Sequence, residues 1–246
     1  MKKFNFRLNT EKNFMKVLRE VARNFQKILG KYLDKNSGKI KDLAGFLNAC
    51  EKYSIKLEPW AERECQKILK RVDAQNAADW RATAPFLQSE ISAQIGAAAA
   101  KDLLFEQVAL IKSLPLEAAQ KAQALAAEAM LGGERAAAIV GRLLDLGAAT
   151  EARAMLIART EIAKANATFT RARSDAAGVT HYVWRTVGDE KVRSAHESLD
   201  GEIFAFAEPP DVEGEGRHHP GEFPNCRCYA EPIILNESLN ERKQVK

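Results

Sequence analysis

The chain changes character in the stretch from Arg159 to Pro232, which contains three separated signatures. They read ARTE at 158–161, SAHESLDG at 194–201 and FPNCRC at 223–228. A histidine, an Asp-Gly turn and a Cys-x-Cys pair fall within about 35 residues, a combination that core packing alone does not demand. The residues before this stretch have helical periodicity and no recognisable chemistry. Any function that the sequence states is therefore expected here.

Around these signatures the pattern changes from one long helix to short strands and turns. Apolar residues keep a helical period from Thr150 to Ala177, and Gly178 is placed to end that helix. The residues that follow predict a small α+β domain, with a strand at 180–187, a short helix at 191–199, a strand at 202–206, a long loop at 207–225 and a strand at 226–235. A polar tail follows at 236–246.

Residues 1–149 are predicted to be helical throughout, with alanine-rich segments that suit close helix packing. Prolines and glycines predict the ends of several helices. The first three are 10–34 with Thr10 as N-cap, 40–53, and Pro59–Ala82. A further helix begins at Ala84-Pro85, the next runs from Ser113-Leu114-Pro115 to Gly132-Gly133, and a short one ends at Gly147. The predicted fold is therefore mainly α, with an elongated helical N-terminal portion and a small C-terminal α+β domain.

Composition narrows the class of protein. The chain has 246 residues, 46% of them hydrophobic, which is typical of a globular protein. Because no run approaches 18 apolar residues, we expect no membrane-spanning helix, and polar residues interrupt the signal-like start, so we expect a cytosolic product. The four cysteines do not form a disulfide framework, and Cys50 and Cys65 fit buried positions of helices.

The charge is unevenly distributed. Residues 1–75 contain 18 Lys and Arg against 9 Asp and Glu, a net +9, whereas the remaining 19 and 24 give the rest of the chain a net −5. This asymmetry indicates an anionic partner for the N-terminal part, either DNA or an acidic protein surface. A solvated face of an amphipathic helix explains it equally well. The candidate contact residues are Lys12, Lys16, Arg19, Arg23 and Lys27.

The Cys-x-Cys pair is a candidate metal site. On a strand Cys226 and Cys228 would point to the same side, and with His196 and either His218 or His219 they would offer zinc two sulfurs and two imidazoles. The common zinc knuckle has Cys-x2-Cys, so this spacing is a looser signal. From the sequence alone we favour the alternative, in which both thiols pack beneath the loop without a metal.

Acid–base chemistry is the second candidate. His196 lies near Arg193 and Asp200, with Glu202 and Glu222 following, so a zinc- or histidine-dependent hydrolase or nuclease is conceivable. However, the sequence has no serine in a nucleophile elbow and no paired carboxylates at a metal spacing. A structural role for His196 and Asp200, with hydrogen bonds to the Gly201 turn and the loop, is the stronger interpretation.

The helix before the strands supplies a further structural candidate. Arg159 and Glu161 face nearly opposite sides of it, and Arg159 is expected to hold loop carbonyls or Asp189.

The segment from about 150 to 235 resembles the C-terminal domain of the phage Mu F-like family of minor head proteins. The matching features are Arg159-Thr160-Glu161 with Asn166, the Trp184 strand, Asp189, Val192-Arg193, His196, Leu199-Asp200-Gly201, Pro224-Asn225-Cys226-Arg227-Cys228 and Pro232. The ordered set is fairly specific, although each piece alone is weak.

The resemblance implies a virion protein of the portal vertex or head interior, present in the host cytoplasm during assembly. Its implied partners are the portal protein and other head proteins, with DNA as a further candidate, and it implies neither catalysis nor a small-molecule substrate. Residues 1–149 would then be a basic, portal-docking region, and 150–235 the Mu F-like domain.

Overall fold

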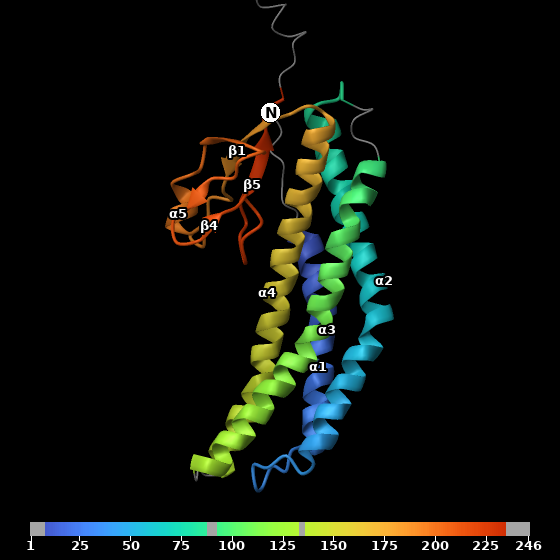
Figure 1. Ribbon diagram of the computed structural model, residues 1–246, viewed down its shortest axis with the longest axis vertical. Coiled ribbons are helices and arrows are strands. Elements are labelled where there is room, and N and C mark those ends of the chain that lie inside the picture. Colours follow the sequence, from blue (N-terminus) through green and yellow to red (C-terminus); the bar gives the residue numbers. More distant parts are fainter. Residues whose placement is uncertain (1–7, 88–92, 133–135, 235–246) are drawn as a thin grey trace, which may run out of the picture. The chain divides into compact units, whose positions relative to one another are not determined.

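The computed structural model describes residues 8–87, 93–132 and 136–234, which form four long helices followed by short strands (Figure 1). The helices are α1 (Leu8–Tyr32), α2 (Leu43–Thr83), α3 (Ala93–Gly132) and α4 (Ala136–Ala176). The C-terminal elements are β1 (His181–Arg185), α5 (Ser194–Glu197), β2 (Ile203–Ala205), β3 (Asp211–Val212), β4 (Gly216–Arg217) and β5 (Tyr229–Pro232). The predicted fold class, mainly α with a small C-terminal α+β region, is confirmed.

The described residues group into two compact units. Among the described residues, the helical unit comprises those within 8–71 and 101–162, and the mixed unit those within 72–100 and 163–234. Three of the long helices therefore contribute residues to both units. The composition change at Thr150 lies inside α4, so the division at 149/150 is not a break between elements, and its functional meaning stays a prediction. The tail at 236–246 lies outside the described residues.

The core of the helical unit is built from the apolar stripes of all four long helices. Its buried members include Phe25 on α1, Phe46 and Cys50 on α2, Ala122 on α3 and Leu143 on α4. The aromatic rings of Phe25 and Phe46 lie 6.3 Å apart between their centroids, which ties the first two helices together. Alanines on α3 allow the other helices to approach closely.

Two prolines that were predicted to begin helices lie inside helices instead. Pro59 is within α2 and Pro115 within α3. Each removes one backbone hydrogen bond, yet buried residues continue at helical spacing on both sides, so tertiary packing holds the helix together. Near Pro115 the Ser113 hydroxyl donates to the Leu110 carbonyl at 3.0 Å.

Three other predicted helix ends were also wrong. Thr10 lies inside α1, and Gly147 lies inside α4. The Gln26 side chain occupies the space beside Gly147 where a Cβ would lie, so this glycine permits close packing of α1 on α4 and does not end a helix. Ala84 and Pro85 form a turn after α2, and α3 begins at Ala93.

The end of α4 agrees with the prediction. Gly178 has a φ of 67°, in the left-handed region that glycine tolerates best. The Val179 N–H donates to the Ser174 carbonyl at 2.8 Å, which closes the helix and aims the chain into β1.

The mixed unit contains an antiparallel sheet of three strands in the order β2-β1-β5. Val183 pairs with Ile203 on one side and with Glu231 on the other, so β1 is the central strand. Strands β3 and β4 form a separate two-stranded hairpin inside the region predicted to be a loop, 207–225. Trp80 from α2 joins Tyr182 and Trp184 in the core of this unit.

A buried polar network joins α2 to α4 within the mixed unit. Arg173 is fully buried and donates to Asp73 at 2.5 Å and to the Asn76 side-chain oxygen at 2.9 Å. Asn76 in turn donates to Thr170 Oγ1 at 2.8 Å. A buried guanidinium of this kind requires its partners, because its charge is costly to leave unpaired.

Among the described residues, none of the helices has the length and apolar character needed to cross a membrane.

Candidate metal centre

The three residues singled out for zinc come from two segments of the mixed unit. His196 lies on α5, a single turn that begins after Arg193 in extended conformation. Cys226 and Cys228 lie in the loop just before β5 and not on the strand itself, which corrects the prediction. Their common direction therefore comes from the loop conformation and not from strand alternation.

The loop is shaped by two residues with positive φ. Asn225 has a φ of 61°, which asparagine tolerates better than most side chains, and it turns the chain directly before Cys226. Gly221 has a φ of 94°, and a Cβ there would lie 3.2 Å from the Ala163 carbonyl oxygen and 3.3 Å from that of Cys228. The glycine thus allows the loop to pack tightly against α4 and against the backbone of Cys228.

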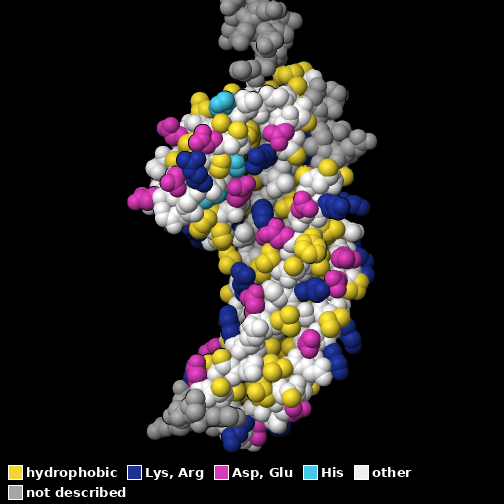
Figure 2. All heavy atoms as spheres, viewed as in Figure 1, with side chains coloured by type: hydrophobic (Ala, Val, Ile, Leu, Met, Phe, Trp, Pro, Cys, Tyr) yellow, Lys and Arg dark blue, Asp and Glu magenta, His cyan; other side chains and the backbone are white. Residues whose placement is uncertain are grey.

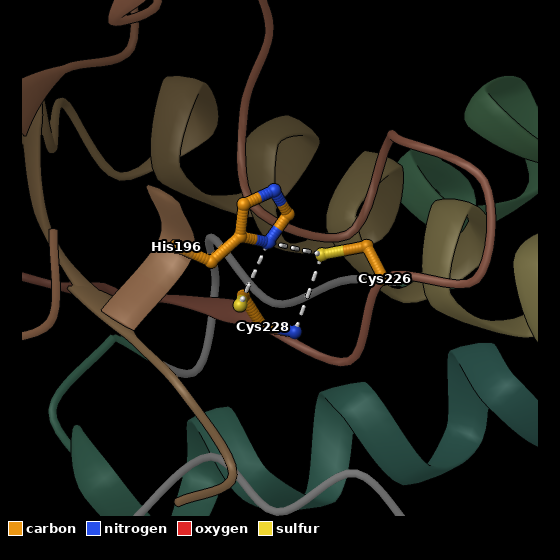
Figure 3. Close-up of side chains that lie close together, drawn as sticks. All are labelled: His196, Cys226 and Cys228. Atoms are coloured by element: carbon orange, nitrogen blue, oxygen red, sulfur yellow. Dashed lines mark hydrogen bonds between the residues drawn. The ribbon is translucent and has the colours of Figure 1, made fainter. Parts of the chain in front are cut away.

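The imidazole of His196 meets both sulfurs through one nitrogen. Nδ1 lies 3.5 Å from Cys226 Sγ and 3.4 Å from Cys228 Sγ (Figure 3). The backbone N–H of Cys228 also donates to Cys226 Sγ at 3.4 Å. All three side chains are buried, with exposed fractions of 2% for His196, 2% for Cys226 and 4% for Cys228.

The other imidazole nitrogen of His196 bonds a carboxylate that the sequence reading missed. Nε2 lies 2.8 Å from Glu215 Oε2, and Arg193 Nε lies 3.3 Å from Glu215 Oε1. Glu215 sits in the β3–β4 turn between Gly214 and Gly216, both with positive φ. That Gly-x-Gly pattern is a hairpin signal, and it could have shown that the loop folds back and carries a carboxylate with it.

The ionisation of these groups is mutually dependent. A hydrogen bond with Cys228, helped by His196, lowers the pKa of Cys226, and the same contact raises the pKa of Cys228. The hydrogen bond with Cys226 raises the pKa of His196, as does Glu215, against the effect of burial. Burial opposes ionisation of Glu215, yet its hydrogen bond with His196 leaves its pKa lowered. The charges of the two sulfurs and of His196 are therefore coupled through these hydrogen bonds.

The two remaining candidate histidines have other partners. His218 Nε2 lies 3.1 Å from Glu215 Oε2, and its Nδ1 lies 3.1 Å from the His219 carbonyl oxygen. His219 Nδ1 bonds the Tyr182 hydroxyl at 3.0 Å. Two groups of possible ligands result, His196–Cys226–Cys228 and His196–Glu215–His218, with His196 in both. The predicted four-residue set is therefore not a single cluster, because His218 sits on the carboxylate side of His196.

An acid–base pair of His196 with Asp200, the weaker of the two interpretations of these residues, is absent from the described contacts. Asp200 Oδ1 accepts from the Thr186 backbone N–H at 2.7 Å and fixes the turn before Gly201, whose φ is 92°. Glu222 accepts from the His219 backbone N–H at 2.8 Å. These carboxylates stabilise turns, and the carboxylate beside His196 is Glu215.

Arg159 was expected to hold loop carbonyls or Asp189, and that role stays a prediction. The contact that the structure describes for it lies in the helical unit, where Nε donates to Glu11 Oε1 at 3.0 Å. Asp189 forms a two-pronged ion pair with Arg227, the residue between the two cysteines. Glu161 is buried in the helical unit near Cys65.

The basic residues of α1 are mostly exposed. Lys12, Lys16, Arg23 and Lys27 face solvent, and Arg23 pairs with Glu20 at 3.4 Å. Arg19 is partly covered and pairs with Glu151 of α4 at 2.9 Å, so it belongs to the packing between helices.

Comparisons with known proteins bear on the C-terminal part. A family model described as Phage Mu protein F like protein matches residues 120–231. A protein of Haemophilus influenzae (strain KW20 / Rd) described as uncharacterized is 39% identical over 129 residues, which cover 52% of this chain. The chain spans only 28% of the length of that relative. No solved structure matches. The C-terminal part of this chain, residues 120–231, thus matches the Phage Mu protein F like family, as the residues around His196 and the cysteine pair predicted.

Proposed function

We propose that this protein is a minor head protein that acts in phage head morphogenesis at the portal vertex. The observation that carries the proposal is the match of residues 120–231 to the Phage Mu protein F like family, which suggests a phage head morphogenesis protein. Its partners are then other head proteins, with the portal protein first among them. The helical region before the Mu F-like part is the proposed docking element.

Assembly fits the chemistry of the mixed unit better than catalysis does. An enzyme on this unit would need a cysteine as nucleophile and His196 as base. These side chains are only 2–4% exposed, and the His196 ring packs against Trp184. The competing proposal, a hydrolase or nuclease on this unit, predicts an activity that His196→Ala abolishes.

Exposed cations form an extended surface on the helical unit, which we call the basic face. On α1 and α2 they recur at spacings of three, four or seven residues, so each set lies along one side of its helix. The members are Lys12, Lys16, Arg23 and Lys27 on α1 and Lys52, Lys56, Arg63, Lys67 and Lys70 on α2. Figure 2 shows dark-blue side chains along the margin over α2.

The geometry of the hairpin supports a single face. α1 and α2 are joined by a short connection and pack through Phe25 and Phe46, with Tyr53 beside Asn24. The buried side chains of both helices lie opposite the cationic stripes, so both stripes point away from the core. Two adjacent rows of cations suit a polyanion, and we propose packaged DNA as the partner of this face.

The portal assignment is tested by co-expression with the portal protein from the same phage genome, followed by affinity capture. Because 149/150 falls inside α4, the full chain is used, and its surface is changed by point substitutions. We expect stoichiometric capture that persists when His196 is replaced by Ala. Failure to associate with the portal or with assembled heads would contradict the proposal.

A further inference from the structure

We propose that His196, Cys226 and Cys228 bind one zinc ion in the mixed unit, with Glu215 orienting the histidine. The proposed ligand atoms are His196 Nδ1 and the two cysteine Sγ atoms. This inference is independent of the role in head assembly, and it replaces the metal-free packing that the sequence favoured.

The separations between the donor atoms already fit a tetrahedral ion. With Zn–S of about 2.3 Å and Zn–N of about 2.0 Å, a sulfur and a nitrogen ligand lie about 3.5 Å apart. The observed distances from His196 Nδ1 are 3.5 Å to Cys226 Sγ and 3.4 Å to Cys228 Sγ. Figure 3 shows both sulfurs directed at the same nitrogen, so an ion can enter with little movement of the backbone.

The histidine is held in the orientation that metal binding requires. The Glu215 carboxylate lies 2.8 Å from Nε2 and is itself paired with Arg193, so it accepts a hydrogen bond from Nε2–H. The lone pair of Nδ1 is then directed at the sulfurs. A carboxylate bonded to the far nitrogen of a ligand histidine is the usual outer partner in zinc sites, because it fixes the tautomer and raises the basicity of the ligand.

The charge of the site also favours an ion. Binding releases two protons to solvent, and Zn²⁺ with two thiolates and a neutral imidazole is electrically neutral, which suits side chains that are 2–4% exposed. Thiolate sulfurs also need hydrogen-bond donors, and the site offers them. The Cys228 backbone N–H donates to Cys226 Sγ. The buried indole N–H of Trp184 has no nitrogen or oxygen acceptor among the described residues, so it is available to a sulfur.

Metal-free alternatives do not account for the position of both sulfurs. Without a metal, one thiol can bond Nδ1 and the other can bond the first sulfur, yet both sulfurs approach Nδ1 equally closely. A disulfide between residues two apart in sequence would be strained, and it would not explain why both sulfurs turn to His196. The second ligand group, His196–Glu215–His218, would need Nε2 of His196 as its donor, yet that atom is bonded to Glu215 while Nδ1 faces the thiols.

The decisive experiment measures zinc in the purified full-length protein after dialysis against a weak chelator. We expect about one zinc per chain, as structural sites give. X-ray absorption should show two sulfurs and two nitrogen or oxygen atoms around zinc, the fourth ligand coming from outside the three residues. Cobalt substitution should give thiolate-to-metal charge-transfer absorption. Less than one-tenth of a zinc per chain together with a silent cobalt spectrum overturns the proposal.

Variants identify the ligands. Cys226→Ala and Cys228→Ala should lose the zinc, and Glu215→Gln should weaken zinc affinity about 10- to 100-fold while retaining stoichiometric binding at excess zinc. The matched control is Cys65→Ala, which removes a buried thiol from the helical unit and should keep the zinc. His218→Gln should also keep it. Zinc retained in both Cys226→Ala and Cys228→Ala, or lost only in His218→Gln, would place the ion elsewhere and refute the assignment.

Discussion

The chain has two pairs of buried cysteines without a disulfide, one pair in each unit, and the two pairs have different neighbours. Cys50 and Cys65 on α2 are fully buried, and burial raises their pKa values to about 11 and about 12, with Glu161 adding to the effect at Cys65. Cys226 and Cys228 are buried to nearly the same degree, but they lie next to each other and to His196. Because of these contacts the pKa of Cys226 is lowered.

Burial alone therefore does not decide what a cysteine does. In the helical unit the thiols act as small apolar side chains. In the mixed unit the polar partners, His196 and through it Glu215, make the sulfurs available as ligands. Four experiments test how far the two units differ.

The largest expected effect is that of a chelator on unfolding. If zinc joins the β5 loop to α5, its removal should lower the free energy of unfolding of the mixed unit by about 5 kcal/mol or more, since metal binding energy appears as folding energy. Thermal melts with and without a strong chelator measure this. Cys226→Ala should melt low under both conditions, and Cys65→Ala should keep the chelator response. If the chelator leaves the melting temperature of the wild type unchanged, a metal does not contribute to its stability.

The second effect concerns ion pairs in the two units. Asp73→Ala leaves the buried Arg173 without its carboxylate, and we expect a loss of about 3 kcal/mol, the low end for breaking a buried pair, because Asp73 is 22% exposed. Its counterpart in the helical unit is Glu151→Ala, which breaks the partly exposed pair with Arg19 and should cost about 0–1 kcal/mol. Urea denaturation compares them, and equal losses would contradict the difference in burial.

The third test compares the reactivity of the two thiol pairs in the folded protein. Adding a chelator should make Cys226 and Cys228 alkylate, because thiolates are the reactive species and the loop is held by the metal. Cys50 and Cys65, with raised pKa values and no exposure, should react only after global unfolding. Peptide mapping after timed labelling distinguishes the pairs. Simultaneous labelling of all four would mean that the units do not differ in this respect.

The smallest effect concerns the basic face of the helical unit. Replacing Lys12 and Lys16 by Gln should reduce the magnitude of the slope of log affinity for DNA against log salt by about 2, because each lost phosphate contact removes a released counterion. The matched control replaces Lys101 and Lys121, exposed on α3. Filter binding over a salt series measures both. A flat salt response in the wild type would exclude DNA and leave an acidic protein surface as the partner.

Much of the fold could be predicted from local patterns. The end of α4 at Gly178, the β1 strand and the switch from helix to strand follow from residue spacing and turn chemistry. The continuity of α2 and α3 through Pro59 and Pro115 could not be predicted, because contacts from other helices compensate for the lost hydrogen bonds. The same holds for Gly147, whose neighbour Gln26 is far away in sequence.

The candidate site was predicted in part. The proximity of His196 to both cysteines was expected and is confirmed by the distances from Nδ1. Glu215 was missed, since only the β3–β4 hairpin brings it back to the histidine. His218 was expected as a ligand beside the cysteines, whereas it bonds Glu215 on the far side of His196, for the same reason. Long loops hide such partners because sequence spacing says nothing about how they fold back.

The interleaving of the two units has a consequence for how the chain is made. Residues 72–100 emerge from the ribosome early, but the rest of the mixed unit begins only at residue 163. At a synthesis rate of roughly 5–20 residues per second, these early residues wait several seconds for their sheet, with Ala77 and Trp80 lacking their native neighbours. A chaperone that covers this segment during translation would protect the nascent chain, and slowed translation after residue 100 should increase aggregation.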